Sequence, residues 1–218
     1  MTPVEELNTE CTAVWALVPA SVASSAAALK RVRDGKPADP VPLSWGEAAE
    51  CTVPAFSCDG GGIPGYTFDA IAKYGLATAK AYPNPTSELG PCRAKEVPSV
   101  AEFGAPFNVT TGGNEPALLA SIAAFGTISS DVYVSVDWQL YTGGILKADE
   151  CKTPRYLNSV VELVGWTGVT DVTKTNGAYI AKNSWGVDWG MDGYIELEYG
   201  ANTCLLTDVC MTIQSTKA

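Results

Sequence analysis

The spacing of apolar residues predicts a helical first half of the chain. Residues 14–33 are apolar or small on nearly every side of a helix, and Asp34-Gly35 follows as a stop signal. This pattern is typical of a buried helix. Pro19 falls inside it and should either bend the helix or confine the proline to a first turn. Further helices are expected over residues 45–51, 65–75 and 116–125.

Local signals support two of these helices. Ser44 with Glu47 three residues later has the pattern of a capping box, which predicts a helix start. Gly75 ends the apolar pattern of the next helix. Between them, Gly60-Gly61-Gly62 predicts an irregular turn, because consecutive glycines suit positive φ and close approach of the backbone.

The second half is dominated by alternating positions. Apolar and polar residues alternate over 132–136, 179–181 and 194–198, which predicts strands. The expected architecture is therefore α+β, with a helical N-terminal lobe, a β-rich C-terminal lobe and a cleft between the lobes.

Composition excludes several classes of function. The 218 residues are 46% hydrophobic and 17% charged, so the chain is globular, and folding should bury roughly 70% of its extended surface. The net charge of −10 argues against binding of nucleic acid or anionic membranes, and ordinary solubility is the preferred explanation of that charge. No apolar stretch approaches the roughly 20 residues of a membrane span.

The cysteines point to an oxidising compartment. There are seven, none in a C-x-x-C pair, and the chain contains no histidine, so a zinc site would need four thiolates. Disulfides are the better interpretation, which places the protein in the secretory pathway, in the extracellular space, a vacuole or a lysosome. An odd count leaves at least one thiol over. We expect no metal and no cofactor. Asn108-Val109-Thr110 is a possible glycosylation site.

Several ordered motifs resemble those of one enzyme family. The chain is similar to the papain-like cysteine proteases, or C1 peptidases, over almost its whole length. The motifs that carry the resemblance are Cys11-Thr12-Ala13-Val14-Trp15-Ala16, Cys58-Asp59-Gly60-Gly61, Gln139-Leu140-Tyr141-Thr142-Gly143-Gly144-Ile145, Asn158-Ser159-Val160-Val161 and Lys182-Asn183-Ser184-Trp185-Gly186. The resemblance implies a papain-like two-lobe fold, with lobes over 1–107 and 108–218, a central helix from about residue 14 and a β-barrel-like second lobe.

The resemblance also shows where this chain departs from the family. Val14 stands at the position of the nucleophilic cysteine, Ser159 at that of the histidine and Asn8 at that of the oxyanion-hole glutamine. Only Asn183, which orients the imidazole in the family, and Trp185, which shields it, remain. Losing one member of such a catalytic unit costs roughly six orders of magnitude in rate. A different cysteine could act as nucleophile if the alignment were wrong, but no imidazole exists to activate it.

Cysteine pairing follows from the resemblance alone. It implies three disulfides, Cys11–Cys58, Cys51–Cys92 and Cys151–Cys204, and leaves Cys210 as the unpaired thiol. A buried, inert Cys210 is the preferred interpretation over an intermolecular link or a reactive site.

The family's substrate groove has counterparts here. The resemblance places Gly60 and Gly61 at a turn whose backbone pairs with extended peptides, and beside it an apolar pocket near Ile63, Leu157, Val160 and Val209. Either this groove still captures a peptide, or it is a remnant that larger side chains or a partner fill.

These observations lead to one preferred function and two alternatives. The preferred function is a catalytically inactive homologue that serves as a structural or interaction subunit of an extracellular or lumenal assembly, with a protein as its partner. The first alternative is a decoy that binds peptides or proteins in the remnant groove. The second is a residual hydrolase.

Overall fold

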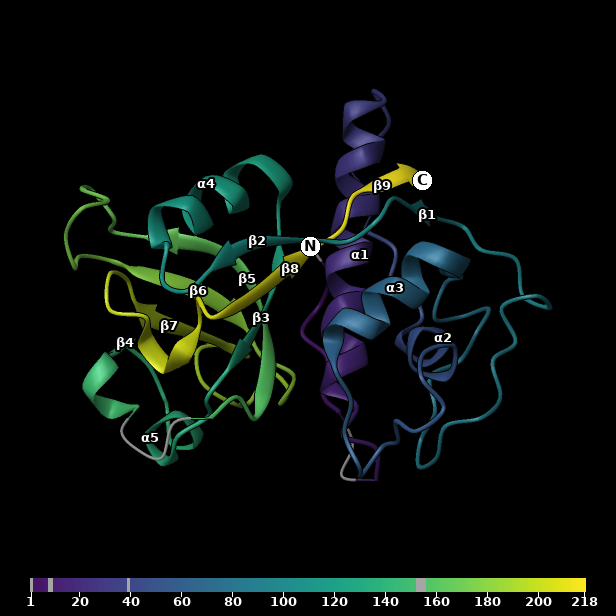
Figure 1. The fold of residues 1–218 in the computed structure, drawn as a ribbon, viewed down its shortest axis with the longest axis horizontal. Helices are drawn as coiled ribbons and strands as arrows, with labels where there is room; N and C mark the ends of the chain where they lie inside the picture. Colours follow the sequence, from purple (N-terminus) through teal and green to yellow (C-terminus); the bar gives the residue numbers. More distant parts are fainter. Residues whose placement is uncertain (1, 8–9, 39, 152–155) are drawn as a thin grey trace. The chain divides into compact units, whose positions relative to one another are not determined.

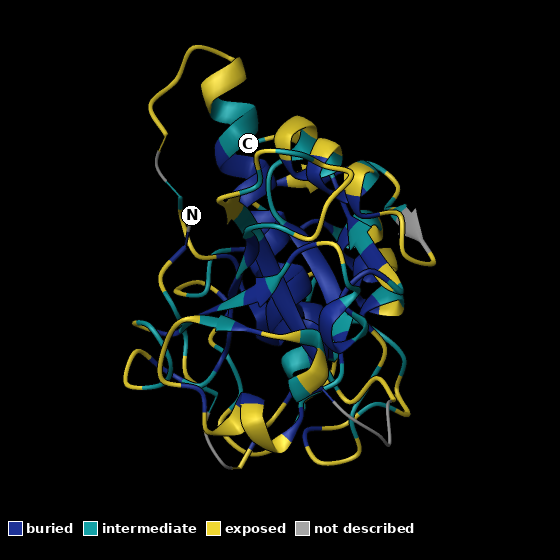
Figure 2. Cartoon of the chain, turned by 90° about the vertical axis from the view of Figure 1, so that its left-hand side faces the viewer, coloured by how far each residue is buried: buried dark blue, intermediate teal, exposed yellow. Residues whose placement is uncertain are grey.

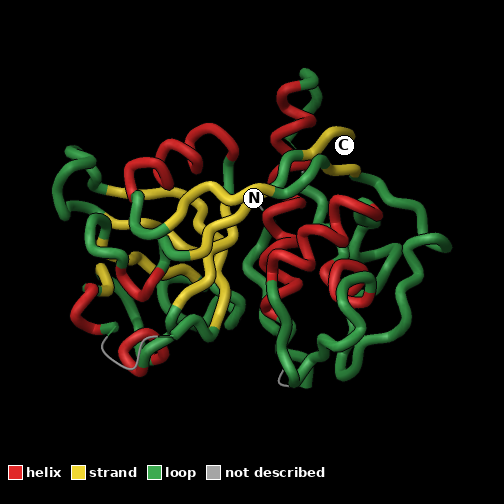
Figure 3. The backbone as a smooth tube through the Cα atoms, in the orientation of Figure 1, coloured by secondary structure: helices red, strands yellow, loops and turns green. Residues whose placement is uncertain are grey.

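The fold is that of a computed structural model, which describes residues 2–7, 10–38, 40–151 and 156–218. The chain forms two compact units. Unit 1 comprises Met1–Pro3, Leu7–Phe107 and Thr212–Ala218, and unit 2 comprises Val4–Glu6 and Asn108–Met211. Unit 1 contains most of the long helices and unit 2 most of the strands (Figure 3). The expected α+β class is confirmed.

The long helix α1 (Val14–Arg33) is the centre of unit 1 and agrees with the predicted bounds. Its residues are buried from Trp15 to Ala28, and the last turn, up to Arg33, becomes exposed (Figure 2). Pro19 lies beyond the first turn, and the helix continues through it. The packing of the buried apolar surface therefore outweighs the hydrogen bond that a proline removes.

The shorter helices begin and end at specific caps. The other elements of unit 1 are α2 (Trp45–Glu50), α3 (Pro64–Tyr74) and the antiparallel pair of strands β1 (Glu102–Phe103) and β9 (Ser215–Lys217) (Figure 1). The Ser44 hydroxyl accepts a bond from the N–H of Glu47 at 2.9 Å. The Glu47 carboxylate accepts instead from the N–H of Ala77 at 2.7 Å, so only half of the predicted capping box forms. The backbone of Gly75 ends α3 at φ +70°.

Unit 2 is built on a seven-stranded sheet. Its strand order is β2-β8-β3-β5-β6-β7-β4. The bounds are β2 (Phe107–Thr111), β3 (Ile128–Val132), β4 (Ile145–Leu146), β5 (Ser159–Thr167), β6 (Ala178–Lys182), β7 (Tyr194–Glu198) and β8 (Val209–Thr212), with helices α4 (Glu115–Phe125) and α5 (Val136–Gln139) and short 3₁₀ turns at Ala148–Glu150 and Thr203–Leu205. Among the described residues the sheet is open, with β2 and β4 at its ends, and does not close into the barrel-like form that was expected.

The first predicted strand of this half was wrong. The alternation over 132–136 suggested a strand, but β3 ends at Val132 and α5 begins at Val136. The reason is Ser135, whose hydroxyl accepts from the N–H of Trp138 at 3.1 Å and caps the helix. Strands β6 and β7 lie where the pattern placed them.

A buried ion pair joins β5 to β6. Glu162 and Lys182 are directly opposite in the antiparallel register, and their charged atoms lie 2.7 Å apart. Their side chains are only 1% and 4% exposed. Glu5 lies near the pair; burial raises the pKa of its carboxyl, and the charge of Lys182 partly opposes that rise. Because an unpaired charge is costly in the interior, this pair favours one register of the two strands.

Three disulfides reinforce the fold. They join Cys11 to Cys58, Cys51 to Cys92 and Cys151 to Cys204, across 47, 41 and 53 residues. These are the pairs that the resemblance implied. Cys210 is a buried free thiol, and its sulfur donates to the carbonyl oxygen of Leu206 at 3.1 Å.

We expect Lys182→Met to lower the free energy of unfolding by about 3–5 kcal/mol, because it leaves the Glu162 carboxylate buried without its cation. The matched control is Lys147→Met, which breaks a more exposed pair with Glu198 and should cost about 1 kcal/mol or less. Urea denaturation of the three proteins measures both values. Equal losses in the two variants would contradict the role given to the buried pair.

Candidate functional site

A cavity of about 480 Å³ opens in unit 2. It is lined by Val134, Gln139, Asn158, Ser159 and Trp185. The lining thus combines the hydroxyl at the predicted histidine position with the indole that was predicted to shield it. The other three residues come from the turn after β3, from α5 and from the residue before β5.

Asn158 holds one wall of the cavity in place. Its backbone N–H donates to the carbonyl of Val132 at 3.0 Å, which extends the β3–β5 ladder. Its side-chain oxygen accepts from the N–H of Val134 at 2.8 Å, and its side-chain nitrogen donates to the Val134 carbonyl at 3.3 Å. The carboxamide is therefore engaged on both sides, which fixes Ser159 next to it at the start of β5.

Trp185, the aromatic residue of the lining, belongs to an aromatic cluster. Trp185 packs edge-to-face on Trp189, with ring centroids 5.0 Å apart, and Trp189 packs on Tyr141 at 5.8 Å. The indole N–H of Trp189 donates to the carbonyl of Gln139 at 3.3 Å. This bond ties the segment after β6 to α5, and both segments contribute a residue to the lining.

Asn183 is buried close in sequence to this wall but does not line the cavity. Its side-chain oxygen accepts from the N–H of Ser184 at 2.9 Å. Its side-chain nitrogen has no hydrogen-bond partner within the described ranges. A buried amide donor without a partner carries a desolvation cost.

In unit 1, Val14 is the first residue of α1. The preceding Ala13 offers no side-chain cap, and the nearby hydroxyl of Thr12 donates to the carbonyl of Cys58 at 3.0 Å. The side chain at this helix start is a hydrocarbon. Asn8, the third predicted position, lies outside the described residues.

The predicted glycine turn forms next to Trp15. A Cβ on Gly62 would lie 2.4 Å from the Trp15 ring, so glycine is required there for close packing. Gly61 has φ +74° with open space around it, whereas the N–H of Gly60 donates to the hydroxyl of Ser57 at 2.7 Å. Ile63 follows as an exposed residue at the start of α3.

Two of the predicted groove residues in unit 2 lie beside a carboxyl. Val160 and Val209 both pair with Asp131 of β3, one from each neighbouring strand. Directly paired residues share a face of the sheet, so a carboxyl lies between the two valines. Burial raises the pKa of Asp131 to about 6. Leu157 is exposed. That these residues form the predicted groove stays a prediction, and Asp131 adds a carboxyl beside its two valines.

The chemistry available in the cavity is limited to hydrogen bonding and apolar contact. Its lining offers a hydroxyl, two carboxamides, an indole and an isopropyl group, and none of these exchanges a proton readily near neutral pH. In the part of the chain that the structure describes, no group of three or more metal-ligating side chains occurs. No helix there is long and apolar enough to cross a bilayer.

Comparison with known proteins places the chain in a family. A family profile described as papain family cysteine protease matches residues 1–213. Cysteine proteinase 3 of Solanum lycopersicum is 34% identical over 151 residues, covering 68% of this chain and 40% of that protein. Cathepsin J of Mus musculus is 29% identical over 201 residues, covering 90% of this chain and 57% of that protein. The chain therefore belongs to the papain family of cysteine proteases.

Solved structures agree on the fold. Bromelain from Ananas comosus, in complex with the E64 inhibitor, matches with a TM-score of 0.80 at 24% identity, over 98% of this chain and 93% of that chain. Digestive procathepsin L 3 from the larval midgut of Tenebrio molitor matches with the same TM-score at 21% identity, over 98% of this chain and 66% of that chain. The predicted papain-like fold is confirmed. The chain spans about half or less of the length of the sequence relatives it matches.

Sequence reasoning missed two kinds of site residue. Gln139 and Asn158 were within the motifs that carried the resemblance, but nothing in the sequence showed that they line one cavity with Val134. Asp131 was missed because the strand was placed four residues too late, at 132 instead of 128. An Asp flanked by Ser130 and Val132 gives no pattern of its own.

We predict that Asp131→Asn flattens the pH dependence of stability between about pH 4 and 6. The folded pKa of about 6 lies above the ordinary value, so the folded state binds the proton more tightly. The stability that the folded state gains from this tighter proton binding is fully present below the unfolded pKa and is lost as pH rises through the folded pKa. At pH 7 the free energy of unfolding of the variant should exceed that of the wild type by about 1–2 kcal/mol.

Denaturation at pH 4, 5, 6 and 7 measures this difference, with the exposed Asp137→Asn as control. Burial also raises the pKa values of Glu5 and Glu47. These two groups therefore make stability fall with rising pH in the wild type and in every variant alike. The difference between Asp131→Asn and wild type isolates the single group. Parallel pH profiles for the two proteins would show that Asp131 titrates normally.

Proposed function

We propose that this papain-family chain does not hydrolyse peptides and acts as a structural or interaction subunit of an extracellular or lumenal assembly. The observation that carries the proposal is the lining of the unit 2 cavity, where Ser159 stands with Asn158, Gln139, Val134 and Trp185 and no group serves as a base. The sequence contains no histidine, so no other arrangement of this chain supplies an imidazole base.

The absence of an available nucleophile supports the same conclusion. Cysteine hydrolases attack with a thiolate that a neighbouring base or cation stabilises. Six of the seven cysteines are in disulfides, and Cys210 is buried against the Leu206 carbonyl. Val14, at the start of α1, is the position that the family resemblance gives to the nucleophile, and a hydrocarbon cannot attack a carbonyl.

An exposed apolar patch on unit 2 supports the interaction role. Val136, the first residue of α5, and Leu140, the residue that caps its C-terminal end, are 69% and 73% exposed and lie one helical turn apart. Val187, 59% exposed, belongs to the segment between Trp185 and Trp189 that contacts α5. We call these three residues the α5 patch. Clustered exposed apolar side chains on a soluble protein are typical of a contact surface.

The charge around the patch indicates the chemistry of the partner. The exposed Asp137 adjoins Val136, and the exposed Asp188 adjoins Val187. Because the residues beside the patch are acidic and the chain carries a net charge of −10, a second copy would be repelled at this surface. The partner that fits is a protein with apolar side chains flanked by lysine or arginine. The three disulfides support an oxidising location such as the secretory pathway, a vacuole or a lysosome.

A peptide-binding decoy is the second candidate. It is favoured by the strip of Val160, Asp131 and Val209 on one face of the unit 2 sheet, where a carboxyl between two valines would accept a cationic side chain. Ile63→Glu and Asp131→Asn test this candidate: loss of a bound peptide in both would support the decoy, and unchanged binding would remove it.

We expect a thiol-directed alkylating probe to leave the native wild-type protein unlabelled. When the protein is unfolded in denaturant without a reducing agent, one label per chain should appear, on Cys210. Val14→Cys is the matched gain-of-label variant, since Val14 is only half-buried, and should react in the native state. Intact mass measures the number of labels. Stoichiometric native labelling of the wild type would contradict the proposal and support the residual hydrolase.

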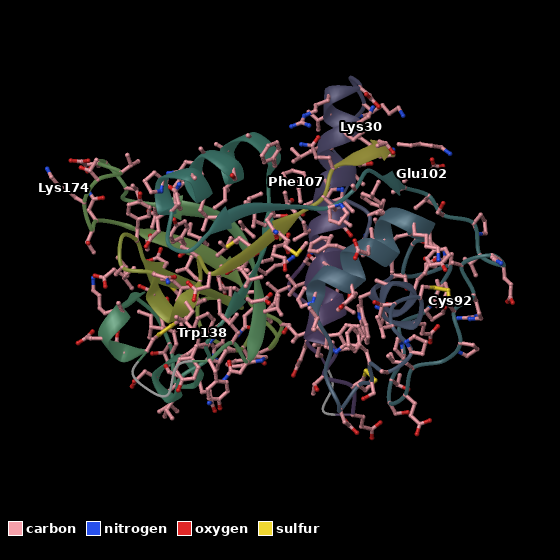
Figure 4. The ribbon with its side chains drawn as sticks, viewed as in Figure 1. Lys30, Cys92, Glu102, Phe107, Trp138 and Lys174 are labelled. Carbon is pink, nitrogen blue, oxygen red and sulfur yellow. A yellow bond between two sulfur atoms is a disulfide. The ribbon has the colours of Figure 1, made fainter. Side chains whose placement is uncertain are left out.

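We expect the protein isolated from its source to have a native mass well above the 22.8 kDa of the chain. Val136→Ser with Leu140→Ser should release the chain as a monomer, because it removes the apolar part of the α5 patch. Val172→Ser is the control. It lies two residues from Lys174, at the end of unit 2 away from Trp138 of α5 (Figure 4), and should leave the assembly intact.

If the wild type isolated from its source had the mass of a monomer, that result would contradict the assembly. An assembly that survives the double substitution would exclude the α5 patch as its contact surface.

A further inference from the structure

The chain contains two asparagines in sequences that accept N-linked oligosaccharide. One is Asn108-Val109-Thr110, and the other is Asn202-Thr203-Cys204, the rarer form with cysteine. The folded state tolerates the sugar only where the side-chain amide reaches solvent and has no structural task. The structure separates the two asparagines on this criterion.

The side chain of Asn202 has structural hydrogen bonds. Its oxygen accepts from the N–H of Thr207 at 3.0 Å and from the Thr207 hydroxyl at 2.8 Å. Its nitrogen donates to the carboxylate of Asp208 at 2.7 Å. The third residue of its sequence, Cys204, is in a disulfide. A sugar at Asn202 would disrupt this turn.

Asn108 is in the opposite situation. It is exposed, and it lies in β2, next to Phe107 (labelled in Figure 4). β2 is a terminal strand of the seven-stranded sheet, with β8 as its neighbour (Figure 1). A substituent on this side chain can extend into solvent without displacing a neighbouring strand.

The sequence of the strand that Asn108 occupies has none of the residue features that usually protect an edge against pairing with another chain. Natural edge strands are kept apart by charged residues, proline, bulges or shortness. β4, at the other end of the sheet, has only two residues. β2 has five, Phe-Asn-Val-Thr-Thr, with no charge and no proline, and with phenylalanine, valine and threonine that favour strands.

We propose that Asn108 carries an N-linked oligosaccharide that shields the β2 edge. In the transfer, the Asn108 side-chain nitrogen forms a bond to the anomeric carbon of a lipid-linked oligosaccharide pyrophosphate. The bond from that carbon to the phosphate oxygen breaks, the lipid pyrophosphate leaves, and the amide loses one proton to a base of the host transferase. This inference depends on the secretory location proposed above and not on the loss of catalysis.

The first test uses the chain secreted from eukaryotic cells behind a cleavable signal, as wild type, Asn108→Gln and Asn202→Gln. Intact mass is measured before and after treatment with a peptide N-glycosidase. Wild type and Asn202→Gln should lose the mass of one oligosaccharide, and Asn108→Gln should lose nothing. No loss from the wild type, or a loss that disappears only in Asn202→Gln, would overturn the assignment.

The second test addresses the shielding. Size-exclusion chromatography over a tenfold range of concentration compares glycosylated wild type with Asn108→Gln and Asn108→Lys. Asn108→Gln should self-associate as concentration rises. Asn108→Lys, which places a charge on the edge without sugar, should remain a monomer like the glycosylated protein. An Asn108→Gln protein that stays monomeric, with its disulfides intact, would overturn the shielding role.

Discussion

The buried pair of Lys182 and Glu162 is the interaction on which the arrangement of the unit 2 site depends. It lies in register between β5 and β6, with 2.7 Å between the charged atoms. Ser159 precedes Glu162 by three residues, and Trp185 follows Lys182 by three. A slip of one residue would turn the side chains of the shifted strand to the other face of the sheet and separate these two side chains from their common cavity. Such a slip would also leave the two buried charges unpaired, which is strongly destabilising.

Much of the fold is predictable where local signals and burial agree. The bounds of α1 follow from small apolar residues on all sides and from the stop at Asp34-Gly35, and β7 follows from strict alternation. The disulfide pairs came from the family motifs and not from spacing, because seven cysteines allow many pairings. Pro19 shows the limit of local rules, since burial of α1 maintains the helix through it.

The errors occur where a single local cap, or contacts distant in sequence, determine the structure. A serine cap at Ser135 ends the alternation that suggested a strand, and the resulting shift concealed Asp131 between Val160 and Val209. The open order of the sheet and the cavity around Ser159 depend on strand neighbours that the chain order does not reveal. The motifs identified which residues matter to the family, and the structure supplied their surroundings: carboxamides, a hydroxyl and indoles in unit 2, and a hydrocarbon at the start of α1.

Peptide cleavage tests the central claim most directly. The purified chain is incubated at several pH values, under mildly reducing conditions, with a mixed library of unstructured peptides, and mass spectrometry counts the products; bromelain serves as the active control. Our account predicts no products above the buffer background at any pH. Cleavage that rises in proportion to the concentration of this chain, and that persists in the most homogeneous fraction, would contradict it.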